Sequence, residues 1–199
     1  MSSEPTSRKL PILVTLVWAF VLVAGTVALN AYGLIEGPRG AAPTAWPKEL
    51  GERSARLGMV VYAHPRCPCT RATLWESAEL VAASEGGLQV EVLFYVPEGE
   101  SEPWAHGDLW SIAEETPNTT PRVDPGGRLA EAHGALTSGH CRVYGPEGAL
   151  LFDGGLTASR GHQGTSAGEE AVRAHIRRQQ TDTITTPVFG CGISEENCS

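Results

Sequence analysis

The stretch LGMVVYAHPRCPC, residues 57–69, joins an apolar run to a pair of closely spaced cysteines. Residues 57–63 are apolar and rich in β-forming residues, as in a buried parallel strand. Residues 70–84 then place apolar side chains near helical spacing and stop at Gly86-Gly87, a typical helix end. We therefore expect Cys67 and Cys69 at the junction of a strand and a helix.

The residues after this helix predict an α/β domain. A second apolar strand, residues 88–96, implies a right-handed crossover and a parallel strand pair. The later elements expected, in chain order, are a helix at 109–115, an edge strand at 119–124, a helix at 127–136, a hairpin of residues 141–144 and 150–152 around Gly145-Pro146-Glu147-Gly148, and a helix at 169–179.

The N-terminal part of the chain predicts a membrane anchor. Residues 10–35 contain no charged side chain, and about 20 apolar residues cross a bilayer as a helix. The apolar run is longer than that of a cleaved signal peptide, so we expect the anchor to be retained. Arg8 and Lys9 precede it, which predicts a cytoplasmic N-terminus at residues 1–9.

The 199 residues then divide into the anchor, a Pro- and Gly-rich linker at 36–56, one domain at 57–180 and a tail at 181–199 that carries Cys191 and Cys198. The formal net charge of −8 offers no basic surface for nucleic acid, so that class of partner is excluded. Five cysteines fit an oxidising compartment outside the cytoplasm, and their odd number leaves at least one without an intramolecular partner.

Cys67-Pro68-Cys69 is the expected reactive centre. A helix N-terminus stabilises a thiolate, and Arg66, Arg71 and His64 would add to this effect. A disulfide across a single residue closes a tight ring and should be strained. The pair can therefore form a strained redox disulfide, react separately with other partners, bind copper or zinc together with His64, His140 or His162, or remain two buried thiols.

Three further segments could complete this centre. In the segment before the hairpin, Cys141 is either a resolving thiol or ligand near the pair or a small buried hydrophobe, and the alternatives are about equal. Arg160 and His162 lie in a glycine-rich loop where a cation could stabilise a thiolate or an anionic substrate. Val188 and Phe189 beside Cys191 predict that the tail docks on the domain and brings Cys191 to the pair.

The segments HPRCPCTRATLWE (64–76), TSGHCRVYGPEGALLFDGGLTASRGHQG (137–164) and TPVFGC (186–191) resemble the bacterial RedB-like family of membrane-anchored, thioredoxin-like proteins. The resemblance implies a three-layer α/β/α thioredoxin-like sandwich with a mixed sheet, on a single-pass protein of the bacterial inner membrane whose domain faces the periplasm. It brings no established reaction. Gly139 stands where this fold usually has a cis-proline, and Gly192 departs from the family's proline.

Together these features predict a thiol-disulfide oxidoreductase that acts on protein or small-molecule thiols and disulfides and needs no cofactor. Its catalytic residues would be Cys67, Cys69 and Cys191. The auxiliary residues would be Arg71, Gly139, Cys141, Arg160 and His162. The alternatives are a copper-binding module that uses Cys67, Cys69, His64 and His162, and a non-catalytic interaction domain.

Overall fold

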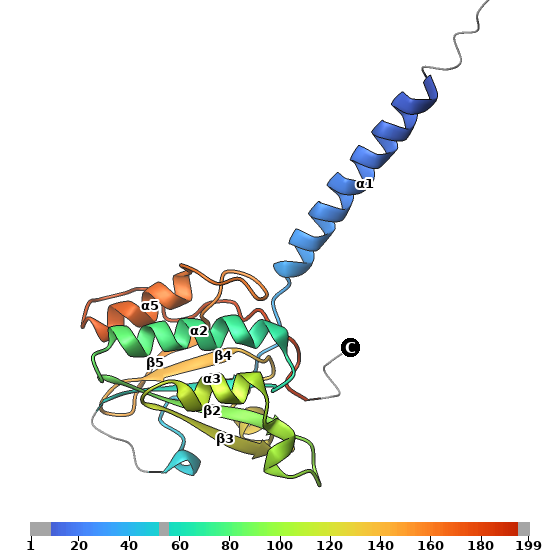
Figure 1. The fold of residues 1–199 in the computed structure, drawn as a ribbon. Helices are drawn as coiled ribbons and strands as arrows, with labels where there is room; N and C mark the ends of the chain where they lie inside the picture. The colour runs from blue at the N-terminus through green and yellow to red at the C-terminus, as the bar shows by residue number, and fades with distance from the viewer. Residues whose placement is uncertain (1–8, 52–55, 195–199) are drawn as a thin grey trace, which may run out of the picture. The chain divides into compact units, whose positions relative to one another are not determined.

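The computed structural model describes residues 9–51 and 56–194, and the chain divides into two compact units, residues 1–35 and 36–199 (Figure 1). The first unit holds one helix, α1 (Lys9–Gly33). An 18-residue stretch within residues 10–33 of this helix has a mean hydropathy of 2.6, and none of its residues is buried. By length and composition α1 can therefore cross a membrane, in agreement with the expected anchor.

The second unit is a five-stranded mixed sheet in the order β3-β2-β1-β4-β5. Strands β1, β2 and β3 are parallel, whereas β4 is antiparallel to both β1 and β5. The strands are β1 (Leu57–Ala63), β2 (Leu88–Val96), β3 (Thr119–Pro125), β4 (His140–Tyr144) and β5 (Leu150–Gly155). The helices of this unit are η2 (Lys48–Leu50), α2 (Pro68–Ala83), η3 (Glu102–Ala105), α3 (Asp108–Glu115), α4 (Arg128–Ala132) and α5 (Ala167–Ile176).

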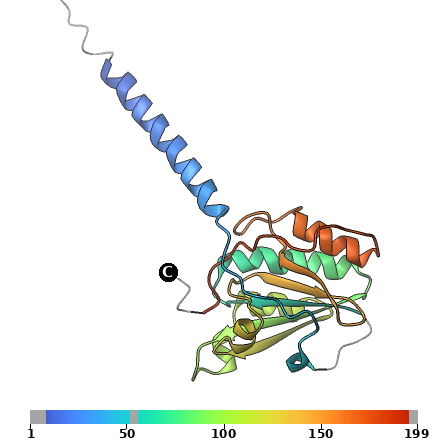
Figure 2. The same cartoon turned by 180° about the vertical axis from the view of Figure 1, so that it is seen from behind.

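Successive residues of β1 point to opposite faces of the sheet, as the strand geometry requires. Met59 and Val61 belong to the larger core, which also contains apolar residues of α2, α3 and α5. Val60 and Tyr62 belong to a second core beneath α4 and η2. Figure 1 shows the layer of α2, α3 and α5, and Figure 2 shows the opposite face. The three-layer α/β/α architecture with a mixed sheet is confirmed.

The segment expected to be a linker, residues 36–56, differs from that expectation. Residues 36–51 belong to the same compact unit as the sheet and run across its second face (Figure 2). The backbone N–H of Trp46 donates to the Gly148 carbonyl at 3.0 Å. The Trp46 ring packs edge-on against the Tyr144 ring, with centroids 5.5 Å apart. Leu50 is buried in the second core. The segment packs because it removes apolar surface of the sheet from water.

Two helices are shorter than their sequence patterns predict. The helix expected at 127–136 is α4, which ends at Ala132 because Gly134 adopts the left-handed region with φ +66° and reverses the chain. The helix expected at 169–179 is α5, which begins at Ala167 behind a Ser166 N-cap and ends at Ile176. Both remain packed where the pattern placed them, so the topology is unaffected.

Candidate functional site

The Cys-Pro-Cys segment lies at the N-terminus of α2. Cys67 is the last extended residue before the helix, with φ −84° and ψ 112°, and Pro68 opens the helix. Proline suits this position because its missing N–H would have no partner in the helix. Cys69 is in the first turn, where unpaired N–H groups and the helix dipole favour negative charge. Cys67 is only 2% exposed, and Cys69 is half-buried.

The C-terminal segment docks on the domain beside this helix start, as the sequence predicts. Val188 is fully buried. The Ser138 N–H, in the loop before β4, donates to the Cys191 carbonyl at 2.8 Å. Cys191 is half-buried as a result. Cys198 lies outside the described residues.

Close backbone contacts fix the position of this tail. A Cβ added to Gly190 would lie 2.0 Å from the Ser138 carbonyl oxygen, so a side chain cannot be accommodated unless the tail moves. The Arg160 guanidinium donates to the Gly190 carbonyl. Earlier in the tail, Arg39 donates to the Thr185 hydroxyl at 2.6 Å. The segment expected to be a linker therefore helps to hold the tail.

This arrangement gathers three cysteines at one point. The Sγ atoms of Cys67, Cys69 and Cys191 all lie within 4.8 Å of one another. Two of them come from the strand-to-helix junction, and the third comes from a segment more than 120 residues later in the chain. The three predicted catalytic residues are therefore brought together by the fold.

Hydrogen bonds at the site favour the thiolate form of Cys67. The Cys69 thiol, the Thr70 hydroxyl and the Cys191 N–H and thiol all donate toward the Cys67 sulfur. The donor from Cys69 is the largest cause, and together these donors outweigh burial and lower the pKa of Cys67 well below its ordinary value. The same contact raises the pKa of Cys69, since its proton is held in the hydrogen bond.

Thr70 and Ser138 link Cys67 to the loop before β4. Their hydroxyl oxygens lie 2.6 Å apart, and the Ser138 hydroxyl also accepts the His64 N–H at 2.7 Å. Because Thr70 has one hydroxyl proton and donates it to Cys67, Thr70 accepts the hydrogen bond from the Ser138 hydroxyl. The sequence analysis did not select these two residues, although both lie inside the motifs that carry the chemistry.

The predicted cationic neighbours lie in different environments. The Arg66 guanidinium stacks on the Trp104 ring at 4.1 Å from its centroid. Arg71 forms an exposed ion pair with Asp108 at 3.0 Å. Arg160, by contrast, reaches the tail beside Cys191, and its charge acts to lower the pKa of Cys69 against the stronger opposing effects there. Of these three arginines, Arg160 is the one that bonds the C-terminal tail next to Cys191.

The histidines proposed as metal ligands do not join the cysteines. His64 is buried and stacks on Tyr95 with ring centroids 5.5 Å apart, and its Nδ1 accepts the Arg66 N–H at 3.2 Å. His162 is exposed. Within residues 9–51 and 56–194, the clustered potential ligands are Cys67, Cys69 and Cys191. The cluster therefore contains the two expected cysteines and Cys191, and neither His64 nor His162 belongs to it.

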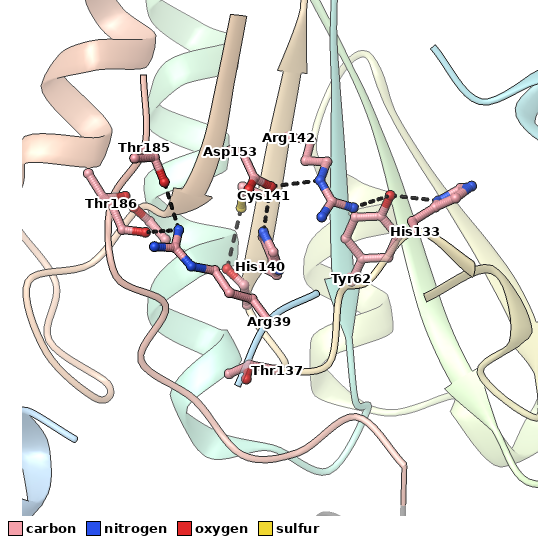
Figure 3. A network of polar contacts seen from close by, with 12 residues as sticks. Arg39, Tyr62, His133, Thr137, His140, Cys141, Arg142, Asp153, Thr185 and Thr186 are labelled. Atoms are coloured by element: carbon pink, nitrogen blue, oxygen red, sulfur yellow. Dashed lines mark hydrogen bonds and ion pairs between the residues drawn. The ribbon is translucent and has the colours of Figure 1, made fainter. Parts of the chain in front are cut away.

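Cys141 lies away from this cluster. It is fully buried in the larger core, where it pairs with Val61 across the sheet, and its Sγ donates to the Gly139 carbonyl at 3.5 Å (Figure 3). Burial raises the pKa of its thiol. Of the two interpretations that the sequence left open, the structure supports a small buried hydrophobe.

Gly139 is required by its backbone conformation. Its φ is +92°, and an added Cβ would lie 2.9 Å from the Thr73 hydroxyl oxygen. Its N–H donates to the Tyr62 carbonyl at 2.8 Å. Gly139 therefore shapes the loop that carries Ser138, and its contribution to the site is positional.

The opposite face of β4 carries a buried polar network that the sequence analysis did not find (Figure 3). The His140 imidazole and the Arg142 guanidinium both bond the Asp153 carboxylate at 2.7 Å. Arg142 also donates to the Tyr62 hydroxyl at 3.4 Å, and that hydroxyl lies 2.8 Å from His133 Nδ1. Burial opposes ionisation of Asp153, but its contacts with His140 and Arg142 hold the pKa of that carboxyl below its ordinary value.

Comparisons with known proteins agree on the fold. No protein-family model and no curated protein matches the chain. An uncharacterized conserved protein from Geobacillus kaustophilus is 17% identical over 81% of this chain and 93% of that chain, with a TM-score of 0.56. A hypothetical protein from Sinorhizobium meliloti is 20% identical over 80% of this chain and 94% of that chain, with a TM-score of 0.55.

The fold is thioredoxin-like. A putative thiol:disulfide interchange protein from Chlorobium tepidum also matches, at 16% identity over 73% of this chain and 97% of that chain, with a TM-score of 0.44. The proteins from Geobacillus kaustophilus and Sinorhizobium meliloti, with TM-scores above 0.5, share the fold, and at such identities they say nothing of the reaction. In this thioredoxin-like domain the site contains one thiol of lowered pKa, Cys67, and two further thiols within 4.8 Å of it. Such a set of thiols can carry out thiol-disulfide exchange or bind a soft metal ion.

Proposed function

We propose that this protein is a membrane-anchored thiol-disulfide oxidoreductase of the RedB-like type, with its thioredoxin-like domain on the periplasmic side of a bacterial inner membrane. The observation that carries the proposal is the convergence of Cys67, Cys69 and Cys191, with hydrogen bonds that lower the pKa of Cys67. A thiolate is the nucleophile in disulfide exchange, so Cys67 is the attacking residue.

In the first step, the Cys67 thiolate attacks one sulfur of a substrate disulfide. A bond forms between Cys67 and that sulfur, the substrate S–S bond breaks, and the other substrate sulfur leaves as a thiolate and takes up a proton. In the second step, a resolving thiolate of this chain attacks Cys67 in the mixed disulfide and releases the first substrate sulfur. The substrate is reduced by two electrons, and two cysteines of this chain are oxidised to a disulfide.

Cys191 is the resolving residue in this proposal. A Cys67–Cys69 bridge would close across the single rigid Pro68, whereas Cys191 approaches from a separate segment and its sulfur is within 4.8 Å of Cys67. Cys69 then serves as the hydrogen-bond donor that keeps Cys67 ionised before the attack. Cys69 thus donates the hydrogen bond to Cys67 and Cys191 resolves the mixed disulfide, whereas in a centre with two cysteines one residue would do both.

The N-terminal helix supports the proposed location. Helix α1 can span a bilayer by length and composition, and Arg8 and Lys9 lie before it, which favours a cytoplasmic N-terminus and a domain on the opposite side. Thiol-disulfide chemistry suits that compartment, where disulfides persist. The substrates are protein or small-molecule disulfides.

Disulfide mapping tests the proposal. The full-length chain in detergent micelles is reduced, freed of reductant, mixed with oxidised glutathione, quenched by alkylation and mapped by peptide mass spectrometry. We expect a reversible disulfide between Cys67 and Cys191. In Cys191→Ser, the mixed disulfide of Cys67 with glutathione should accumulate, because its main resolving thiol is absent.

Cys141→Ser is the matched control, since it removes a buried thiol of the same domain and should leave the Cys67–Cys191 bond unchanged. If Cys67 stays alkylated as a free thiol in all conditions, the oxidoreductase proposal is wrong. A bridge between Cys67 and Cys69 that forms equally fast in wild type and Cys191→Ser would instead remove the role of Cys191.

A further inference from the structure

The cluster of Cys67, Cys69 and Cys191 contains sulfur ligands alone. Within the part of the chain that the structure describes, no histidine or carboxylate joins this group. Thiolates are soft ligands that select Cu(I), Zn²⁺ or iron–sulfur clusters among biological metals. The chemistry of the donors therefore limits the ions that this site could hold.

The spacing of the sulfurs fits one ion. A metal bound to three coplanar sulfurs at about 2.3 Å keeps them about 4 Å apart. The three Sγ atoms already lie within 4.8 Å of one another, so each pair needs to approach by less than about 1 Å. Rotation of the cysteine side chains can supply movement of this size without a change in the backbone.

The number of ligands separates the candidate metals. Structural zinc sites are almost always tetrahedral and need a fourth protein ligand. The described residues supply three thiols at this point. We propose that Cys67, Cys69 and Cys191 form a three-coordinate thiolate site for Cu(I), which the reduced protein binds with a stoichiometry of one ion per chain.

The surroundings of the cluster suit such a site. Three thiolates and Cu(I) carry a net charge of −2, which the N-terminus of α2 and the nearby Arg160 partly balance. Cys67 is 2% exposed and the other two cysteines are half-buried, so the sulfurs are partly shielded from water. Binding releases the protons of those thiols that are not yet ionised, and no electron is transferred.

Cu(I) binding goes beyond the proposed disulfide exchange, although it uses the same thiols. A disulfide between any two of these cysteines removes two ligands, so the oxidised protein should not bind the ion. Bound Cu(I) should in turn block attack by Cys67. The two activities are therefore mutually exclusive states of one site, and each can be measured without the other.

A competition titration tests the site. Reduced full-length protein in detergent micelles, without oxygen, is titrated against a coloured Cu(I) chelator, with Cu(I) alone as the probe. We expect one ion bound per chain. Cys191→Ser should weaken binding at least roughly 100-fold, while Cys141→Ser and Cys198→Ser should bind as wild type does.

A second readout guards against variants that fold poorly. In the wild type, bound Cu(I) should protect Cys67, Cys69 and Cys191 from alkylation and leave protection of Cys141 unchanged. Gly190→Ala keeps every thiol but displaces the tail, so it should also weaken binding. Gly107→Ala, where an added Cβ meets no atom within 4 Å, is the matched control and should bind as wild type does.

Several outcomes would overturn the copper site: binding without a one-to-one stoichiometry, binding unaffected by Cys191→Ser, or one-to-one binding of Zn²⁺ that depends on Cys198. Loss of the copper site leaves the glutathione assay intact as evidence for disulfide exchange. Conversely, a chain that binds Cu(I) through these thiols and never forms the Cys67–Cys191 bond would retain this inference and lose the proposed function.

Discussion

Cys67 and Cys141 are both almost completely removed from solvent, at 2% and 0% exposure, yet their environments drive their thiols in opposite directions. Around Cys67, four hydrogen-bond donors face the sulfur and lower its pKa. Around Cys141, burial in apolar surroundings is the leading effect, and the pKa rises. Burial by itself therefore does not decide reactivity, because donors directed at the sulfur can outweigh the loss of water.

The two regions also differ in how their polar groups are used. At the start of α2, Thr70 donates a hydrogen bond to a sulfur that can react, and Ser138 contacts the Thr70 hydroxyl. On the far side of β4, His140 and Arg142 both bond the Asp153 carboxylate inside the fold. The first region should therefore control chemistry, and the second should control stability.

The largest expected difference is between Cys67→Ser and Cys141→Ser. Loss of the nucleophile should reduce disulfide exchange by roughly 1,000-fold or more. Cys141→Ser should leave the exchange rate unchanged but lower the free energy of unfolding by about 1–3 kcal/mol, because a hydroxyl is placed in an apolar core. Exchange rates with oxidised glutathione and chemical denaturation measure the two effects. Equal losses of exchange in both variants would contradict the division between the regions.

Asp153→Ala tests whether the network behind β4 controls stability. The change leaves Arg142 buried without its carboxylate, so unfolding should become easier by about 3–5 kcal/mol. Asp108→Ala removes an exposed ion pair with Arg71 and should cost no more than about 1 kcal/mol. Urea denaturation of both variants checks the comparison. If Asp153→Ala lost disulfide-exchange activity under conditions where the variant is fully folded, the network would also contribute to the reactivity of the thiol site.

Gly190→Ala tests the tail with every cysteine still present. The added methyl group would meet the Ser138 carbonyl, so the tail must shift and Cys191 must move from Cys67. Because small displacements of reacting groups are costly, resolution of the mixed disulfide should slow by roughly 10- to 100-fold. Stopped-flow quenching followed by mass spectrometry gives the rate. Gly107→Ala should resolve at the wild-type rate.

Thr70→Val tests the hydrogen bonds at Cys67 and has the smallest expected effect. Removal of the hydroxyl should raise the pKa of Cys67 by about one unit. The rate of alkylation, which increases as the thiolate forms, should then reach its midpoint at higher pH than in the wild type. Arg71→Gln is the comparison, since Arg71 pairs with Asp108 and should shift the profile less.

The same lowered pKa predicts the sign of the pH dependence of stability. In the folded protein Cys67 stays ionised to lower pH than in the unfolded chain, so its contribution to stability is complete above about pH 8.5. The contribution disappears as the pH falls through the folded value. Denaturation of the reduced protein at several pH values, with Cys67→Ser as the reference, measures this contribution.

The sequence was most informative where the pattern is local. The bounds expected for β1 and β2, residues 57–63 and 88–96, are those observed, because continuous apolar runs between turn residues leave little choice of strand. The position of Cys67 and Cys69 at the start of a helix followed from the same pattern. The apolar residues beside Cys191 also predicted the docking of the tail.

The sequence was least informative where the environment of a side chain depends on which face of its strand it occupies. Both faces of the sheet are buried, so alternation along β4 could not tell whether Cys141 faces the thiol cluster or the core. His140 and Arg142 pair with Tyr62 and Val60 of β1, which belong to the second core. Their partner Asp153 lies on the neighbouring strand, and the register that joins them is a tertiary property.

The amino-acid sequence by itself determined the α/β order of elements, the apolar anchor and the placement of Cys67-Pro68-Cys69 at a helix N-terminus, since these depend on local periodicity and helix geometry. The sequence predicted that the tail brings Cys191 to this pair, but only the tertiary structure decided how closely the three sulfurs approach, that His64 and His162 stay outside the cluster, and that Cys141 stays in the core. Contacts between segments far apart in the chain, such as Ser138 with Cys191, set those distances. The sequence shows that a single residue separates Cys67 from Cys69, whereas the position of the Cys191 thiol beside them results from folding.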